Sequence, residues 1–470
     1  MKIQSSLALG GLAVIALSSA CVLAAGSHPP ASGGATTASE TPLPDDERPG
    51  GKLIDWSMRP GNEWVYSGGD GSFYCYVDLK SGEPRGTKKR TPLNISLVLD
   101  RSGSMGGDKI RYAKEAAKFV IQQLDNDDIV SIVNYDDRIE VTSASQPVRN
   151  KEVLLRAIDK LTARGSTNLT GGMLEGYAQV NHTRREGYVN RVLLLTDGLA
   201  NVGITQPQQI KKLVEKEYRE HGIALSTFGL GADYNEELLT MLAETGRANY
   251  YYISQADGIP DIFARELKGL LSVVAQNATV SLPVPAGWEC EKVYGYPYEI
   301  HDGKVVVHFN DVYANDEKAI LVKFHVPRSF TEQVTLRCNL SYIGARNFNR
   351  VSENRQARVS ATSDPRLVER SKDATVEEMI ALFESNERFE ELMADVDRGD
   401  YTAAKVKATT VVKELQVRQQ VYKSEKLKKQ EERVNSYLSN MDNMQTMQGE
   451  EKKGYQKYNR SVNYEIRKMK

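Results

Sequence analysis

Five oxygen-bearing side chains in three separate segments of the chain could together bind a metal ion. Residues 100–104 read Asp-Arg-Ser-Gly-Ser, so a carboxylate and two hydroxyls alternate with other residues. Thr167 lies in a Gly-Ser-Thr-Asn segment, and Asp197 lies in a Thr-Asp-Gly segment. Carboxylate and hydroxyl oxygens are hard ligands, which suit Mg²⁺, Mn²⁺ or Ca²⁺. The candidate metal ligands are Asp100, Ser102, Ser104, Thr167 and Asp197.

The elements around these segments would place them at one edge of a parallel sheet. Residues 93–99 and 191–195 are nearly continuous aliphatic runs, as expected of strands covered by helices on both faces. In open sheets of this kind, ligands bind outside the carboxyl ends of the strands. Gly103 lets the backbone turn tightly between the two serines. Two carboxylates would balance the charge of a divalent cation, which could then attract an anionic oxygen from outside.

The region from residue 92 to residue 271 is predicted to be an α/β fold with a doubly wound, mainly parallel sheet, because apolar strands alternate with amphipathic helices. We expect strands at 93–99, 128–134, 191–195, 224–229 and 250–253, and helices at 109–124, 169–184, 207–221 and 236–245. After residue 276, strands separated by turns favour an antiparallel sandwich. Short β pieces between residues 56 and 90 could pair with those strands if the α/β region is an insertion.

The C-terminal region returns to helical periodicity at residue 375, breaks at Gly399-Asp400 and continues to residue 417. Beyond Lys423 the density of Lys, Glu and Gln predicts a solvated helix or a partly disordered tail. We therefore expect a signal peptide (1–25), a flexible tether (26–51), a β appendage (52–91), the α/β domain (92–271), a β-sandwich-like domain (277–365) and a helical C-terminal region with a charged tail (374–470).

The first residues have the composition of an export signal. Lys2 precedes an apolar run from Leu7 to Leu17, which ends in Ser-Ser-Ala-Cys. Cys21 at this position predicts a bacterial lipoprotein site, with plain cleavage near Ala24 or Ala25 as the alternative. We expect an exported protein of the bacterial cell envelope, in the periplasm or at the outer membrane, anchored by lipid if Cys21 is lipidated.

The charge and the remaining motifs argue against two classes of ligand. The chain has 61 Lys and Arg against 62 Asp and Glu, so no broad basic surface is expected to attract nucleic acid. Gly171-Gly172 opens a predicted helix, but no Lys-Ser or Lys-Thr follows as a P-loop requires, so no nucleotide site is expected. None of the six histidines lies in the three candidate metal segments.

Two further groups of residues leave alternatives open. Cys290 and Cys338 both lie in the strand-rich region and could form a disulfide or remain buried thiols. Together with Cys75 they make three cysteines after Cys21, so at least one of them cannot pair within the chain. Asp136 and Asp137 follow a predicted strand and could support the cation site from behind its ligands. The simpler interpretation, which we favour here, is that both aspartates solvate a turn.

The segments PLNISLVLDRSGSM (92–105), GSTNL (165–169) and LLLTDG (193–198) resemble the three motifs of the metal-ion-dependent adhesion site (MIDAS) in von Willebrand factor type A (VWA) domains. The resemblance covers residues 92–271 and implies a metal-binding role for the same five candidate ligands. Family members commonly keep one coordination position for water or for a partner's acidic side chain. A VWA domain followed by a β region also resembles exported bacterial proteins and inter-alpha-trypsin inhibitor heavy chains.

Together these features predict a non-enzymatic, exported binding or adhesion protein. Its cation, Mg²⁺ in the first place with Mn²⁺ and Ca²⁺ as alternatives, would bridge to an acidic side chain of a protein partner. One alternative is a structural subunit of an envelope complex, in which the metal only stabilises the loops. Another is a metal-dependent hydrolase, which needs a general base or a second metal that the sequence does not convincingly offer.

Overall fold

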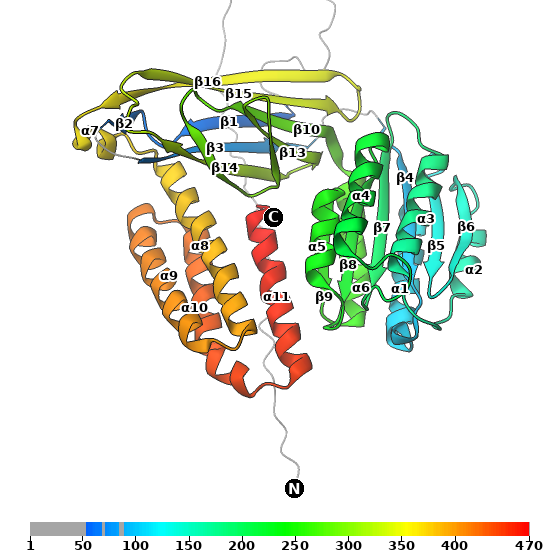
Figure 1. The fold of residues 1–470 in the computed structure, drawn as a ribbon. Coiled ribbons are helices and arrows are strands. Elements are labelled where there is room, and N and C mark those ends of the chain that lie inside the picture. Colours follow the sequence, from blue (N-terminus) through cyan, green and yellow to red (C-terminus); the bar gives the residue numbers. More distant parts are fainter. Residues whose placement is uncertain (1–52, 68–70, 84–88, 470) are drawn as a thin grey trace, which may run out of the picture. The chain divides into compact units, whose positions relative to one another are not determined.

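The computed structural model describes residues 53–67, 71–83 and 89–469 of the chain. The predicted export signal, the tether and Cys21 lie outside the described residues. Figure 1 shows three groups of elements: a sandwich of two β-sheets, an α/β unit that we define as residues 93–271, and a set of C-terminal helices.

The α/β unit is built on one six-stranded sheet. Its strand order is β6-β5-β4-β7-β8-β9, and only the pairing of β5 with β6 is antiparallel. The strands are β4 (Leu93–Asp100), β5 (Ile129–Tyr135), β6 (Ile139–Pro147), β7 (Val189–Thr196), β8 (Ala224–Leu230) and β9 (Arg247–Ile253). Every residue of β4 is buried, as expected of a central strand covered on both faces. The predicted fold class is confirmed.

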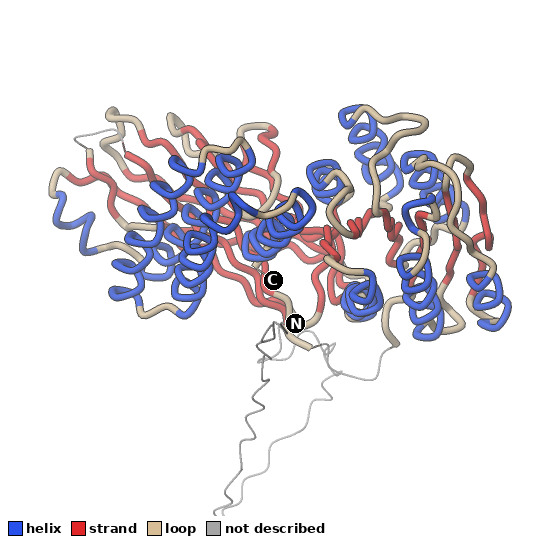
Figure 2. The backbone as a smooth tube through the Cα atoms, turned by 90° about the horizontal axis from the view of Figure 1, so that it is seen from below, coloured by secondary structure: helices blue, strands red, loops and turns tan. Residues whose placement is uncertain are grey.

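Helices cover both faces of this sheet (Figure 2). One face carries α1 (Asp108–Gln123), α2 (Lys151–Asp159) and α6 (Ile259–Leu271). The other face carries α3 (Leu169–His182), α4 (Pro207–His221) and α5 (Glu236–Thr245). The sequence prediction placed α1, α3, α4 and α5 but missed α2, α6 and the edge strand β6. The strand β6 was missed because most of its residues are exposed or half-buried, so it lacks a long apolar run.

The sandwich consists of a four-stranded sheet, β1-β3-β14-β11, and a six-stranded sheet, β12-β13-β10-β15-β16-β2. Its strands are β1 (Ile54–Pro60), β2 (Trp64–Tyr66), β3 (Gly71–Ser81), β10 (Val273–Pro283), β11 (Glu289–Tyr294), β12 (Tyr298–His301), β13 (Lys304–Tyr313), β14 (Glu317–Val326), β15 (Gln333–Gly344) and β16 (Arg350–Thr362). Because β3 pairs with β14 and β2 pairs with β16, the segment before the α/β unit is an integral part of the sandwich. The expected pairing is confirmed, and the α/β unit is an insertion.

Three cysteines contribute free thiols to the sandwich. Cys75 and Cys338 are buried in its core, and Cys290 is half-buried. Burial raises the pKa of the Cys338 thiol to about 12, so this thiol stays protonated. Of the two alternatives for Cys290 and Cys338, the described structure has the free thiols.

The C-terminal helices contact the sandwich at two places: the longest packs on the outer face of the four-stranded sheet, and the first and shortest lies against β2 and β16. They are α7 (Pro365–Arg370), α8 (Ala374–Asp397), α9 (Tyr401–Tyr422), α10 (Glu425–Thr446) and α11 (Gly449–Arg467). Tyr76 of β3 and Leu321 of β14 share one buried cluster with Phe383 of α8. Gly399, with a φ of +84°, lies between α8 and α9, where the break was predicted. Among the described residues, no helix is both long and apolar enough to cross a membrane.

Of the two alternatives expected beyond Lys423, the partly disordered tail is wrong for the described residues, which are helical, and the helices are not wholly solvated. Helix α10 buries one apolar stripe against α8 and α9, and α11 follows it as a regular helix. The stripe has the spacings of 3, 4 and 7 residues that are typical of an amphipathic helix, and it consists of Leu427, Val434, Tyr437, Met441 and Met444. Because many charged residues lie between these positions, the composition of the segment does not indicate that one face of the helix is apolar.

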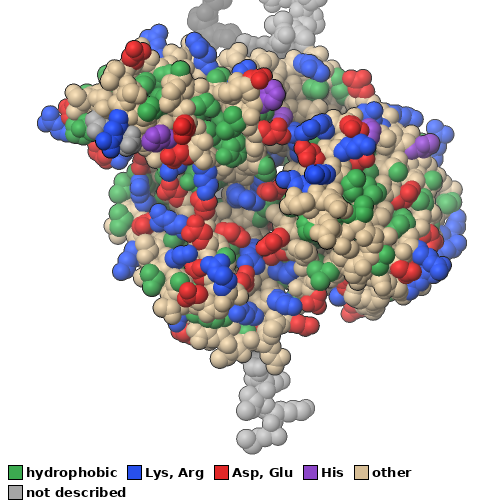
Figure 3. Space-filling model, in the orientation of Figure 1, with side chains coloured by type: hydrophobic (Ala, Val, Ile, Leu, Met, Phe, Trp, Pro, Cys, Tyr) green, Lys and Arg blue, Asp and Glu red, His purple; other side chains and the backbone are tan. Residues whose placement is uncertain are grey.

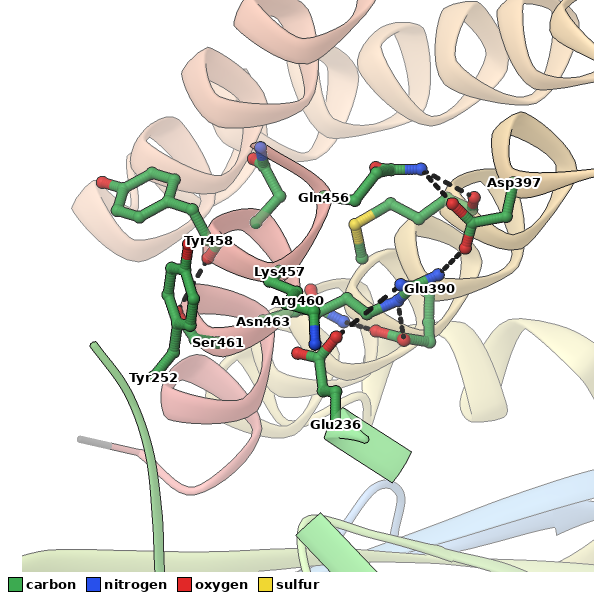
Figure 4. A network of polar contacts seen from close by, with 12 residues as sticks. Glu236, Tyr252, Glu390, Asp397, Gln456, Lys457, Tyr458, Arg460, Ser461 and Asn463 are labelled. Carbon is green, nitrogen blue, oxygen red and sulfur yellow. Dashed lines mark hydrogen bonds and ion pairs between the residues drawn. The ribbon is translucent and has the colours of Figure 1, made fainter. Parts of the chain in front are cut away.

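Helix α11 contacts the α/β unit through polar side chains (Figure 4). Lys457 Nζ donates a hydrogen bond of 2.5 Å to the carbonyl oxygen of Tyr234. The Arg460 guanidinium lies 3.7 Å from Glu236 of α5 and 3.5 Å from Glu390 of α8. This helix therefore joins the α/β unit to the other C-terminal helices by hydrogen bonds and ion pairs.

Candidate metal centre

The five predicted ligands meet at the carboxyl edge of the sheet in the α/β unit. Asp100 is the last residue of β4, and Asp197 directly follows β7, the neighbouring parallel strand. Ser102 precedes a short 3₁₀ helix, η2 (Gly103–Met105), which contains Ser104. Thr167 lies two residues before α3. Three loops that are distant in sequence thus share one edge, as the strand pattern predicted.

Hydrogen bonds connect the side chains of the first and third loops. Ser104 Oγ donates to Asp197 Oδ1 at 2.7 Å, and the hydroxyl oxygens of Ser102 and Ser104 lie 3.1 Å apart. The backbone N–H of Ser102 donates to Asp100 Oδ1 at 2.8 Å. The two carboxylates and the two serine hydroxyls therefore face one small region.

The second loop brings the Thr167 hydroxyl to the same region. A Cβ atom placed on Gly198 would lie 3.6 Å from Thr167 Oγ1 and 3.9 Å from Ser104 Oγ. Asn201 fixes the backbone of Thr167, because its Oδ1 accepts from the Thr167 N–H at 2.9 Å and its own N–H donates to the Thr167 carbonyl at 3.1 Å. The sequence prediction did not include Asn201, although it lies only four residues after Asp197.

Asp100 is a buried carboxylate without a basic neighbour. Its side chain accepts hydrogen bonds from the Thr196 hydroxyl (2.7 Å) and the Ser102 N–H. In the described part of the chain, no Lys or Arg forms an ion pair with it, and burial raises its pKa to about 6. A buried carboxylate favours a compensating positive charge. The hard oxygen donors around it suit a divalent cation, so these residues fit the metal that the sequence motifs imply.

Asp136 holds the first and second loops together, and the prediction that it solvates a turn is wrong. The residue is fully buried. One carboxylate oxygen lies 2.9 Å from Arg101 Nε in the first loop and 2.8 Å from Arg164 Nε in the second. The Asp136 carbonyl also accepts from the N–H of Asn168, at 2.8 Å. Asp136 thus acts behind the ligands, whereas the neighbouring Asp137 is half exposed, as expected of a turn.

Backbone hydrogen bonds bring the same two loops into direct contact. The N–H of Gly103 donates to the carbonyl of Gly165 at 3.0 Å, and the N–H of Arg164 donates to the carbonyl of Arg101 at 2.7 Å. Gly165 has a φ of +70°, and a Cβ atom there would lie 2.1 Å from Asp137 Oδ1. Only glycine meets both conditions at this position.

Comparison with known families accounts for this arrangement of loops. Residues 94–265 match the model of the family described as von Willebrand factor type A domain. The chain contains a VWA domain. Domains of this family commonly bind a divalent metal ion at the MIDAS and take part in protein–protein interactions. The resemblance to VWA domains is therefore confirmed.

Known relatives cover different shares of this chain. The uncharacterized protein YfbK from Escherichia coli (strain K12) is 35% identical over 42% of this chain and 35% of its own length. Inter-alpha-trypsin inhibitor heavy chain H3 from Homo sapiens is 27% identical over 39% of this chain and 20% of its own length. The E3 ubiquitin-protein ligase WAV3 from Arabidopsis thaliana is 25% identical over 67% of this chain and 42% of its own length. The chain thus spans less than half the length of each of these relatives.

A solved structure shares the fold beyond the VWA domain. The von Willebrand factor type A structure from Catenulispora acidiphila aligns with a TM-score of 0.64 over 78% of this chain and 87% of that chain. The two sequences are only 15% identical over the aligned region. This likeness shows a common fold and carries no information about partners.

The glycine pair that opens α3 serves the packing of the VWA domain. A Cβ atom on Gly172 would lie 2.4 Å from the ring of Tyr135 in β5. The hydroxyl of that tyrosine donates to the Leu195 carbonyl at 3.1 Å, inside the sheet that positions Asp197. Glycine therefore lets α3 lie close to the strands that carry the metal loops.

A separate cavity of about 1080 Å³ lies between the VWA domain, the sandwich and the C-terminal helices. None of the five metal-site residues lines it. Its walls carry basic and acidic side chains together with several tyrosines. In Figure 3, side chains of both charges mix along the surface between the C-terminal helices and the VWA domain. A mixture of this kind favours no single charge of ligand.

His308, at the wall of this cavity, should make the folded chain sensitive to acid. Burial, aided by the nearby Arg247, lowers the pKa of His308 to about 4, below its usual value near 6.5. The unfolded chain therefore takes up this proton first, so the free energy of unfolding should fall as the pH drops from about 6.5 through 4. Urea unfolding at pH 7.5 and 5.0 should show a smaller loss for His308→Gln than for the wild type.

The matched control for this measurement is His301→Gln, because the His301 side chain is 76% exposed. This variant should keep the wild-type dependence on pH. Equal losses for the wild type and both variants would contradict the prediction.

Proposed function

We propose that this chain is an exported binding protein of the bacterial cell envelope, whose VWA domain holds one divalent cation and presents it to an acidic side chain of a protein partner. The observation that carries the proposal is the buried Asp100 carboxylate, which accepts from the Thr196 hydroxyl and the Ser102 N–H but forms no ion pair with a basic side chain of the described chain. The proposed ligands are Asp100, Ser102, Ser104, Thr167 and Asp197.

The charge of the donor set supports a binding role. Two carboxylates, those of Asp100 and Asp197, balance the charge of one divalent cation, and the three hydroxyls add none. A bound cation would act as a Lewis acid toward an anionic oxygen from outside. Hard oxygen donors favour Mg²⁺, with Mn²⁺ and Ca²⁺ as alternatives. The exposed side chain of Ser104 marks the side of the site that a partner could reach.

The proposed location rests on the sequence of the first 25 residues, with lipid attachment at Cys21 as the proposed anchor. Fractionation of cells that produce the full chain, with and without Cys21→Ala, tests this part. We expect the wild type in the membrane fraction and the variant in the soluble envelope fraction. Equal distribution of both would contradict lipid anchoring.

Asp100→Asn tests the metal site directly. This change keeps the shape of the side chain but removes its charge. We expect the Mn²⁺ affinity to fall at least roughly hundredfold, because replacing a residue that only hydrogen-bonds to a metal ligand already lowers metal affinity by about 10–100-fold. Isothermal titration with Mn²⁺ measures this loss. In a parallel pull-down from envelope extract, the wild type should retain a partner that chelator or Asp100→Asn releases.

The matched control is Asp108→Asn, which removes a nearby carboxylate with a side chain that is 74% exposed. It should bind Mn²⁺ and partner as the wild type does. If Asp100→Asn behaved like this control in both assays, the proposed function would be wrong.

A further inference from the structure

Lys109 places a positive charge beside one of the two metal-site carboxylates. It is the second residue of α1, the helix that follows the first metal loop. Its Nζ lies 2.5 Å from Asp197 Oδ2, while Ser104 Oγ donates to the other oxygen of the same carboxylate. The Asp197 side chain is fully buried, and the Lys109 side chain is 37% exposed. The ammonium therefore reaches inward from the solvent to the ligand.

The two carboxylates of the site thus differ in their neighbours. Asp197 has a basic side chain of this chain as its counter-ion, whereas Asp100 receives only hydroxyl and backbone N–H donors. A divalent cation shared by both carboxylates would lie close to the Lys109 ammonium, and two positive charges at such a distance repel each other. Binding of the cation would require the ammonium to leave Asp197. The long, flexible and partly exposed lysine side chain can move into solvent without disturbing α1.

We infer that Lys109 is a tethered competitor of the metal ion, which occupies Asp197 when the cation is absent and lowers the affinity of the site for divalent cations. This inference rests on the proposed function, because it assigns a role to Lys109 at the same site. It gives the site two alternative positive charges, one built into the chain and one taken from solution. Binding of the cation then exchanges one for the other.

Lys109→Met tests the inference, because methionine keeps most of the aliphatic stem and removes the charge. In the wild type, the cation must first break the charged hydrogen bond between Lys109 and Asp197. The variant lacks this bond, so we expect it to bind Mn²⁺ about tenfold more tightly than the wild type. Isothermal titration of the whole chain with MnCl₂ measures the affinity. Lys109→Gln serves as a second neutral variant if the methionine variant folds poorly, and Lys109→Arg, which keeps the charge, should stay close to the wild type.

The matched control is Lys114→Met on the same helix, where Nζ instead donates to the Asp159 carbonyl. This change should leave Mn²⁺ affinity unchanged. Thermal unfolding adds a readout that a merely structural ion pair would not give. In chelator, Lys109→Met should melt below the wild type because Asp197 loses its counter-ion. With saturating MnCl₂, the order should reverse or the difference should vanish.

The outcomes separate the inference from the function on which it rests. If the wild type binds Mn²⁺ but the neutral variants bind it equally or more weakly, the inference about Lys109 is wrong and the metal site stands. If neither the wild type nor the neutral variants bind Mn²⁺, the proposed function fails and takes the inference with it. Binding that only the neutral variants show would support the competition in its strongest form.

Discussion

Asp136→Asn is expected to lower the free energy of unfolding by about 3–5 kcal/mol, the usual cost of removing one partner from a buried ion pair. The Arg101 side chain is only 6% exposed and points at this carboxylate, so without it the buried charge would keep only the half-exposed Glu140, 2.8 Å away, as its partner. The change should also weaken Mn²⁺ binding, because Arg101 and Arg164 hold the first and second metal loops to Asp136. Urea unfolding and isothermal titration measure the two effects.

The adjacent residue provides a matched control for this prediction. Asp137→Asn removes the same charge one position away, from a side chain that is 49% exposed and 3.9 Å from Arg138. Surface pairs of this kind contribute about 0–1 kcal/mol. If the two variants lost stability equally, Asp136 would not have the structural role that its contacts indicate.

Arg191→Met is expected to cost a similar amount, about 3–5 kcal/mol, at a site far from the metal loops. Arg191 lies in β7 of the VWA domain, and its side chain is fully buried. One of its terminal nitrogens lies 2.5 Å from Asp311 in the sandwich, and the other lies 3.7 Å from Glu266 in α6. Without the guanidinium, two carboxylates would remain buried close together. Differential scanning calorimetry of the variant should show the loss.

Removing the whole group of charges should be much less harmful than removing the arginine alone. A triple variant, Arg191→Met with Glu266→Gln and Asp311→Asn, leaves no unpaired charge and should recover most of the lost stability. Arg219→Met, which breaks an exposed i,i+4 pair with Glu215, should stay within about 0.5 kcal/mol of the wild type. A triple variant as unstable as the single one would contradict the electrostatic explanation.

The meeting of the candidate ligands at one sheet edge could be predicted from sequence, because Asp100 ends β4 and Asp197 directly follows β7, two strands with long aliphatic runs. Such strands lie in the centre of a parallel sheet, covered by helices on both faces. Segments that follow them within a few residues therefore lie at the carboxyl edge of the sheet. The residues behind the ligands carry no such signal. Asp136 looks like any acidic residue in a turn, and its burial depends on Arg101 and Arg164 from two other segments. Lys109 was likewise seen only as the start of a helix.

The fold was predictable where contacts are local and less so where they join distant segments. The strand–helix alternation predicted the α/β fold class with its mainly parallel sheet, and the helix break at Gly399 follows from one residue type. The partners of β3 could be suggested but not assigned, because β-pairing depends on side-chain patterns in strands far apart in sequence. The helix α10 was hidden because its apolar stripe is a minority of a highly charged segment.

The insertion of the VWA domain into the sandwich has a consequence for synthesis of the chain. Ser81, at the end of β3, donates a hydrogen bond to the carbonyl of Tyr313, 232 residues later. In the proposed export the chain emerges with its N-terminus first, so those 232 residues reach the folding compartment after β3 does. The VWA domain, a continuous segment, can fold within that interval. Strand β3, with Phe73, Val77 and Leu79 turned to a core not yet made, can pair with β1 on one edge but must wait for β14 on the other. The nascent chain is therefore most prone to aggregate just before β14 emerges.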